Sequence, residues 1–254
     1  AAMVLGAVSI IAIILFIMNE TRAAEPMMPF RIWKERSVFI ANLTSLVTGI
    51  ILIGISSFLP AFVQGVMERS PTVAGFTLTA MSIGWPIAST LSGKLLLTVG
   101  LRITSLFGGG ALIAGSLLFA TLSPEDGPLW AALGSFVVGI GMGLTTTAFI
   151  VSIQGTVPWE DRGAATASNS FMRNLGNTIG AALLGGVLNS SVKERLADSS
   201  LSNHNITMDS INNLLSDSER SHMSADLKFL LQDTLTGALQ TVYLVVLLFA
   251  IVSL

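Results

Sequence analysis

The sequence contains no cysteine, few charged residues and only two histidines. Without cysteine, the chain can form neither a disulfide bond nor a metal site with thiolate ligands. Charged residues make up 11% of its 254 residues, whereas an average soluble domain has about 25%. His204 and His222 lie in one polar segment, and the sequence shows neither a nucleophile–base spacing nor a phosphate-binding glycine loop. We therefore expect no enzyme, no metal site, no cofactor and no nucleic-acid partner.

The few charges are unevenly distributed and leave six uncharged runs along the chain. A helix needs about 20 mainly apolar residues to cross roughly 30 Å of hydrocarbon, and each run approaches or exceeds that length. Runs such as 52–63 and 243–254 do not alternate apolar and polar residues, which argues against a membrane β-barrel. With a further span around Arg173, the sequence predicts an all-α polytopic membrane protein. The predicted spans are 1–18, 37–64, 74–97, 103–122, 129–155, 164–188 and 234–254.

Lysine and arginine in the short loops predict the orientation of these spans. Loops rich in Lys and Arg alternate with loops that have almost none, which places 19–36, 98–102 and 156–163 in the cytoplasm. Residues 19–36 form a charged linker between the first span and a set of six. The long polar segment 189–233 then faces outside, where either short amphipathic helices or disorder fits its composition. Two groups of apolar residues in it recur at helical spacing: Ile211, Leu214 and Leu215, and then Met223, Leu227, Leu230 and Leu231.

Glycines recur four residues apart in two of the spans, at Gly139 and Gly143 and at Gly176 and Gly180. Such pairs allow two helix backbones to approach closely within a bilayer. Two interpretations stay open for them. They are consistent with static packing, and equally with a smooth surface along which one helix slides past another.

The predicted span 164–188 carries a cation near its middle, Arg173. Four polar residues share one face of this helix: Thr166, Ser170, Arg173 and Asn177. A central Arg costs at least about 2.5–3.5 kcal/mol on insertion scales, so this face should meet protein or water. Arg173 either locks helices together by pairing with a carboxylate or carbonyls, or has a functional role. No Asp or Glu lies in the core of any span, so a carboxylate partner would come from outside this chain.

Two stretches of the sequence resemble one known family. Residues 137–185 contain a glycine-rich helix, then Val157-Pro158, Arg162-Gly163-Ala-Ala-Thr-Ala and Arg173-x-x-Gly176-x-x-x-Gly180. Residues 36–84 contain Leu-Pro-x-Phe-x-Gln before Ser-Pro-x-x-Ala-Gly. Both stretches are similar to the fourteen-helix drug:proton antiporters of the major facilitator superfamily, the EmrB/QacA type. The resemblance covers most of residues 30–188 in the right order.

The resemblance implies that residues 37–254 form the C-terminal six-helix lobe of such a protein. Residues 1–18 would be the last helix before it, and an N-terminal lobe of the same chain would precede both. The implied function is proton-coupled efflux of drugs or other amphipathic small molecules across the plasma (inner) membrane by alternating access. The implied partners are the lipid bilayer, the small-molecule substrate, protons and the N-terminal lobe. A dedicated metabolite or siderophore exporter is the alternative, and a non-transporting membrane receptor or assembly subunit is a more distant one.

The resemblance also implies site residues on three helices. Residues expected to line a central cavity are Asn42, Thr48 and Ser56 on the first helix of the lobe, and Thr146 and Gln154 on the fourth. Residues of the fifth helix expected to face the N-terminal lobe are Asn169, Arg173 and Asn177, with Ser170 on the same polar face. Serine, threonine and asparagine also form hydrogen bonds between membrane helices, so a packing role stays open for them.

Residues 93–102 depart from the cytoplasmic motif of the superfamily, which runs Gly-x-Leu-x-Asp-Arg-x-Gly-Arg-Arg. The residues that are kept are Gly93, Leu95, Gly100 and Arg102. Leu97 stands where the Asp is expected, and Thr98 where the Arg is expected. This departure argues against an inner-gate role for the segment, since the charged contact of the motif cannot form.

Overall fold

The structure is a computed structural model that describes residues 31–198 and 225–254, together with residues 8, 11, 14, 15, 18 and 19. Most of the predicted span 1–18 and most of the linker 19–36 lie outside the described residues. Within those described, the chain consists of six long α-helices and three short helical turns, and it contains no strand. The predicted all-α fold is therefore confirmed.

Each long helix corresponds to one of the last six predicted spans. The helices are α2 (Arg36–Ala61), α3 (Pro71–Thr98), α4 (Gly100–Ala120), α5 (Gly127–Thr156), α6 (Arg162–Asp198) and α9 (Ala225–Val252). The short turns are η1 (Ile32–Lys34) before α2, the π-helical η2 (Phe62–Val66) after it, and η3 (Trp159–Asp161) before α6. Pro60 lies inside α2, one residue before the helix passes into η2.

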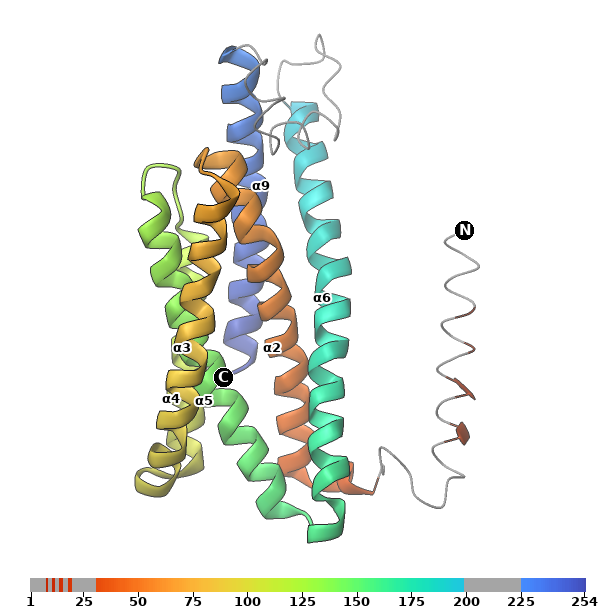
Figure 1. Cartoon of the computed structure of the whole chain (residues 1–254). Helices are drawn as coiled ribbons and strands as arrows, with labels where there is room; N and C mark the ends of the chain where they lie inside the picture. Colours follow the sequence, from red (N-terminus) through yellow and green to blue (C-terminus); the bar gives the residue numbers. More distant parts are fainter. Residues whose placement is uncertain (1–7, 9–10, 12–13, 16–17, 20–30, 199–224) are drawn as a thin grey trace.

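The helices form an upright bundle whose connections alternate between two ends (Figure 1). The end that holds η1, the α3–α4 turn and η3 is called the linker end here, and the opposite one the far end. This agrees with the predicted alternation of loops, because the three cationic connections share one end. α6 packs mainly against α2, and α5 packs against α3 and α4. α9 closes the bundle by packing against α4, α6 and α2.

The predicted polar segment 189–233 is shorter in the structure, because α6 continues to Asp198 and α9 begins at Ala225. The charges in this segment end the apolar run but not the helices. Val192 of α6 and Leu231 of α9 are 1% and 0% exposed, so core packing continues past the predicted limits. The leucines at 227, 230 and 231 belong to α9. The remainder, with both histidines and the other predicted amphipathic positions, lies outside the described residues.

Four of the helices are long and apolar enough to cross a membrane, judged by length and composition. These segments are Arg36–Val66, Gly100–Ala120, Gly127–Thr156 and Leu227–Val252. α3 and α6 have 28 and 37 residues, so they fall short in apolar character rather than in length. Large apolar side chains cover the outside of the bundle, among them Phe76, Phe107 and Leu248. Such a surface fits contact with lipid.

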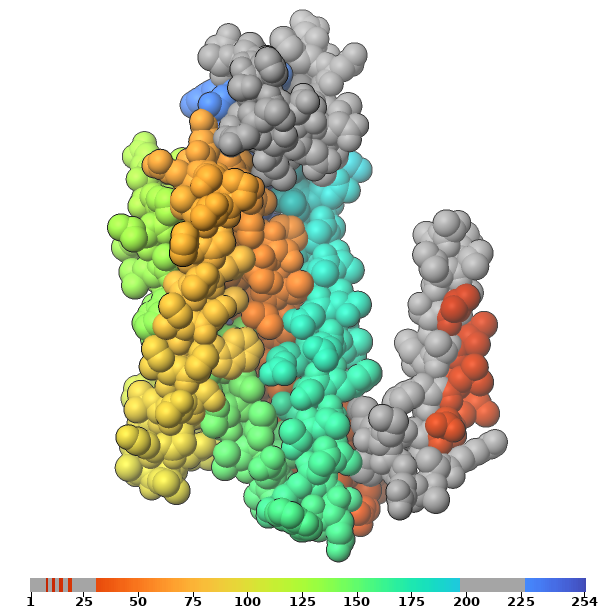
Figure 2. Space-filling model, viewed as in Figure 1, coloured from red at the N-terminus to blue at the C-terminus, as the bar shows by residue number. Residues whose placement is uncertain are grey.

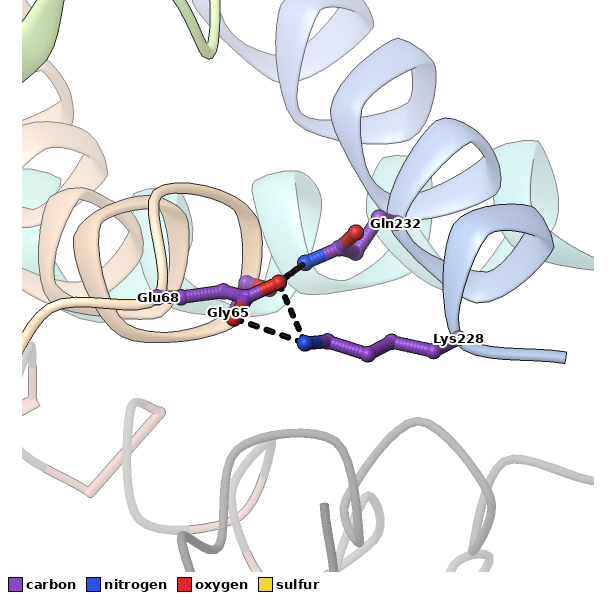
Figure 3. Close-up of polar contacts among 4 residues, drawn as sticks. All are labelled: Gly65, Glu68, Lys228 and Gln232. Atoms are coloured by element: carbon purple, nitrogen blue, oxygen red, sulfur yellow. Dashed lines mark hydrogen bonds and ion pairs between the residues drawn. The ribbon is translucent and has the colours of Figure 1, made fainter. Parts of the chain in front are cut away.

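Polar contacts tie the chain after α2 to the start of α9 at the far end of the bundle (Figure 3). The Lys228 Nζ lies 2.7 Å from the Glu68 carboxylate. The Gln232 side chain donates to Glu68 Oε1 at 2.6 Å and to the carbonyl of Gly65 at 3.4 Å. Glu68 has a positive φ of 54°, where the chain turns from η2 toward α3. Below this contact, Tyr243 is fully buried between Phe62 and Phe119, with ring centroids 6.3 and 5.5 Å away.

Candidate functional site

α6 lies against α2 at backbone distance, along a set of glycines that we call the α2–α6 seam: Gly49, Gly176 and Gly180. A Cβ atom added at Gly49 would meet the backbone carbonyl of Arg173, and one at Gly176 would meet that of Leu46. One at Gly180 would lie 2.8 Å from the backbone of α2. The prediction that Gly176 and Gly180 let two helices approach closely is therefore confirmed.

A second set of glycines brings α3 against α5 in the same way, and we call it the α3–α5 seam: Gly139 and Gly143. An added Cβ at Gly139 would meet the carbonyl of Met81, and one at Gly143 would meet the carbonyl of Trp85. This confirms the close approach predicted from the second glycine pair. The two seams fix α6 to α2 and α3 to α5.

Two of the predicted site residues, Asn42 and Asn169, are buried inside the α2–α6 interface. They are 0% and 3% exposed. The Asn169 side-chain amide donates to the carbonyl of Ala41 at 3.1 Å and to Asn42 Oδ1 at 3.3 Å. Asn42 in turn donates to Ser168 Oγ at 3.3 Å. In this structure both asparagines therefore link α2 to α6. The central-cavity position of Asn42 and the lobe-facing position of Asn169 stay predictions.

Three other residues predicted to line a cavity are Thr48, Ser56 and Thr146, and none of them lines the open cavity described below. The Thr48 hydroxyl is buried and donates to the carbonyl of Ser45 at 2.9 Å. The Ser56 hydroxyl donates to the carbonyl of Ile53 at 3.5 Å, so both hydroxyls are satisfied within α2. Thr146 is half-buried on α5 and is not among the residues of the cavity described next.

An open cavity of about 620 Å³ lies at the linker end, where α5, η3 and α6 meet. Its lining consists of Gln154, Trp159, Arg162, Gly163, Thr166, Ala167 and Ser170. The cavity thus brings together two predicted site residues, Gln154 and Ser170. The Gln154 side chain donates to Thr166 Oγ1 at 3.4 Å, which links α5 to α6. Arg162 lies over the ring of Trp159, with its guanidinium carbon 5.1 Å from the ring centroid.

Arg173 lies one turn beyond Ser170 on the same helix and is half-buried. Its guanidinium carbon is 6.0 Å from the ring centroid of Trp85 on α3. Across the described part of the chain this is the one interaction recorded for its side chain, and neither a carboxylate nor a hydrogen-bond acceptor is paired with it. One turn farther, Asn177 Oδ1 is buried and has no hydrogen-bond partner among the described residues.

The space-filling view shows the face of the bundle on which these residues' helices meet (Figure 2). α3 (gold) and α6 (teal) lie on either side of α5 (green) in the lower half of this view. The Arg173–Trp85 contact therefore joins the two flanking helices, while the seams hold each of them to its own central helix. These flanking helices are also the two that fall short in apolar character. This less apolar face is the candidate site.

The degenerate motif lies at the linker end, where α3 turns into α4, and comprises Gly93, Leu95, Gly100 and Arg102. Gly100 has a φ of 82°, which favours glycine because it has no Cβ atom. Leu97, at the position of the motif's Asp, is 90% exposed. Among the described residues no ion pair involves Arg102. The structure thus gives Gly100 a role in the turn.

Sequence reasoning missed two residues and one ion pair that lie at or beside the site. Trp85 stands beside Pro86 in an uncharged run, and nothing in the sequence shows that it lies near Arg173. Gly49 has no glycine four residues away and so gives no pattern. The Arg31–Asp161 ion pair, at 2.8 Å, ties the linker to η3, but its partners are 130 residues apart.

Comparison with known proteins identifies the family of this chain. A family model described as Major Facilitator Superfamily matches residues 1–181. The chain belongs to the major facilitator superfamily. Since several of its helices are long and apolar enough to cross a membrane, it is part of a multi-pass membrane protein of that superfamily.

Relatives within the superfamily carry names that refer to drugs. The multidrug transporter protein MdtP of Bacillus subtilis (strain 168) is 31% identical over 194 residues, which is 76% of this chain and 36% of that protein. Multidrug resistance protein 3 of the same organism is 30% identical over 185 residues, covering 73% and 36%. A tetracycline resistance determinant of Streptomyces rimosus is 28% identical over 201 residues, covering 78% and 58%. The match therefore spans just over a third of each Bacillus protein.

Proposed function

We propose that this chain forms the C-terminal lobe, with one preceding helix, of a fourteen-helix efflux transporter. It would export drugs or other amphipathic small molecules across the plasma membrane in exchange for protons, by alternating access. The family match and the names of the relatives support export of drugs. In this proposal the N-terminal lobe of the full-length protein lies against the face that carries Arg173 and the cavity.

The polar face of α6 is the observation that carries the proposal. Thr166, Ser170 and Arg173 follow one another along it, beside a cavity large enough for a small molecule. A cation near the middle of a membrane span is expected to face water, protein or a ligand, because burial in lipid costs at least about 2.5–3.5 kcal/mol. Since the opposite side of α6 is closed against α2 by glycines, the polar face is the side left for a ligand and a second lobe.

Proton exchange needs a carboxylate that binds and releases protons within the membrane. In the six described helices, acidic residues occur only toward the far ends of α6 and α9: Glu194, Asp198, Asp226 and Asp233. The proposal therefore places the proton-carrying carboxylate in the N-terminal lobe. That carboxylate is also a possible partner for Arg173 in one state of the transport cycle.

Dye efflux from cells that express the full-length protein tests this function. We expect cells with the wild-type protein to export amphipathic dyes, and we expect collapse of the proton gradient to abolish that export. Arg173→Ala should slow export about tenfold or more at equal membrane levels, as for loss of a charged hydrogen bond. Arg173→Lys should retain part of the rate.

Two results would contradict the proposal for Arg173. Wild-type export from both variants would remove any mechanistic role for this side chain. Loss of membrane-inserted protein from both variants would instead make Arg173 a packing residue. Export that persists without a proton gradient would contradict proton coupling while leaving efflux itself in place.

A further inference from the structure

The surroundings of Arg173 and Trp85 point to a class of substrate. We infer that the face between α3 and α6 binds aromatic molecules that carry a negative charge. Arg173 would pair with the anionic group, and Trp85 would contact the aromatic ring. This inference rests on the proposed function, because it names the substrate class of the same site.

Arg173 gives this face a positive charge, and no ion pair joins it to a carboxylate among the described residues. Arg173 is the one Lys or Arg of the described helices that lies more than about two turns from a helix end. The others lie within about two turns of a helix end: Arg36, Lys94, Arg102, Arg162, Lys193, Arg195 and Lys228. The acidic residues of these helices also lie toward their ends. A molecule bound at mid-height therefore meets a cation and no described carboxylate.

The contact with Trp85 does not replace an anionic partner. A distance of 6.0 Å to the ring centroid is at the outer limit of cation–π contacts, which lies at about 6 Å. The guanidinium also has five N–H donors, which an aromatic face leaves without ordinary acceptors. A carboxylate, sulfonate or phenolate oxygen accepts such donors, and a carboxylate can accept two in parallel. A lipophilic cation would instead meet a like charge.

The glycine seams hold the backbone at Arg173 and Trp85 in place before a ligand arrives. The backbone carbonyl of Arg173 lies against Gly49 of α2, and that of Trp85 lies against Gly143 of α5. Their separation is therefore set by packing of the bundle and not by the ligand, which lowers the entropy cost of binding. The cavity of about 620 Å³ begins one turn away at Ser170, a volume within the roughly 300–1,000 Å³ typical of small-molecule sites.

Two xanthene dyes of opposite charge provide matched probes for this inference. Fluorescein is anionic at neutral pH and rhodamine 123 is cationic, while both have the same tricyclic ring. Fluorescence polarisation with the purified full-length protein measures the affinity for each dye. We expect fluorescein to bind more tightly than rhodamine 123 to the wild-type protein. Arg173→Gln should weaken fluorescein about tenfold or more and leave rhodamine 123 equally or more tightly bound.

Further variants separate charge, ring and helix stability. Lys193→Gln removes a cation from the far end of the same helix, where its side chain is exposed, and should change neither affinity. Trp85→Leu should weaken both dyes, and Trp85→Phe should restore most of the loss. Where Arg173→Gln does not reach the membrane, Arg173→Lys keeps the charge without the planar fork and should weaken fluorescein alone.

The inference is overturned by tighter binding of rhodamine 123 to the wild-type protein, or by an equal loss of both dyes in the Arg173 variants. Binding is measured without a proton gradient, so it is independent of transport. A protein that selects fluorescein in solution but exports neither dye from cells would contradict the proposed efflux function and leave the substrate class standing. Export of rhodamine 123 without binding of fluorescein would contradict the inferred substrate class and leave the proposed efflux function standing.

Discussion

The two sides of α6 differ more than their composition suggests. Toward α2 the helix lies at backbone distance, with Gly176 and Gly180 at the contact and the Asn42–Asn169 hydrogen bond buried beside them. On its other side, Ser170 lines an open cavity and Arg173 reaches Trp85 on a different helix. Both sides carry polar residues, but one is closed and satisfied within the described structure while the other is open.

Neighbouring residues on this helix therefore have different roles. Asn169 and Ser170 are adjacent in sequence, yet a step of one residue turns a helix by about 100° and moves the side chain to another face. The type of residue does not reveal which side it occupies. The side that a residue occupies is revealed by its position relative to a glycine that contacts another helix, because that glycine marks the closed face of the helix. The predictions that follow test this difference.

The largest effect is expected at the α2–α6 seam. Gly176→Ala places a Cβ atom against the backbone carbonyl of Leu46, where no side chain can move aside. We expect a loss of about 1–3 kcal/mol or more in the free energy of unfolding, as for overpacked cores. Thermal unfolding of the detergent-purified full-length protein measures it. Gly185→Ala on the same helix has open space around it and should unfold at the wild-type temperature or above; equal melting of the two variants would mean that the seam is not tight.

Cysteine labelling should separate the open side from the closed side directly. The chain has no cysteine of its own, so Ser170→Cys and Ser168→Cys each introduce one thiol into it. Ser170 lines the cavity, whereas Ser168 is 1% exposed. We expect a water-soluble maleimide to react about tenfold faster or more with the thiol at 170, since reaction requires an accessible thiolate. Similar rates would show that α6 is rotated relative to this structure.

A smaller effect is expected for the buried amide pair. Asn169→Ala leaves Asn42 without its donor, and should cost about 1–2 kcal/mol of unfolding free energy. In a double-mutant cycle with Asn42→Ala, we expect a coupling energy of about 0.6 kcal/mol, the average for such bonds in membrane proteins. Chemical unfolding of the four proteins provides it. Strict additivity would mean that the two amides do not interact in the folded protein.

The smallest effect is expected at the ion pair between the linker and η3. Arg31 is 75% exposed and its partner Asp161 is 17% exposed. Pairs of this kind contribute about 0–1 kcal/mol and are screened by salt. Arg31→Ala should therefore lower the unfolding temperature by about 4 °C at most, and less at high salt. A larger shift than in Asn169→Ala would reverse the ranking of exposed and buried contacts proposed here.

The sequence predicts the fold well because a membrane helix needs a long run of mainly apolar residues, which is easy to recognise. Long uncharged runs indicated the helices, and glycines four residues apart indicated both seams. The ends of α6 and α9 were misjudged, because charges stop an apolar run while Val192 and Leu231 still pack inside the bundle. The sequence could not separate Asn42 from Gln154 as site residues, because both are polar residues on apolar helices. Only the three-dimensional arrangement of the helices shows that Asn42 accepts a hydrogen bond from Asn169, whereas Gln154 lines the cavity.

The contact between Gly49 and the backbone of Arg173 divides α6 into a short segment toward the linker end and a long segment toward the far end. We call this contact the pivot. At 1.5 Å per residue, the helix extends about 17 Å from this pivot to the linker end and about 38 Å to the far end. A tilt of about 10° around the pivot would then move the linker end by roughly 3 Å and the far end by roughly 7 Å. Arg173, at the pivot itself, would stay almost still. A charge that holds a ligand is best placed where the helix moves least.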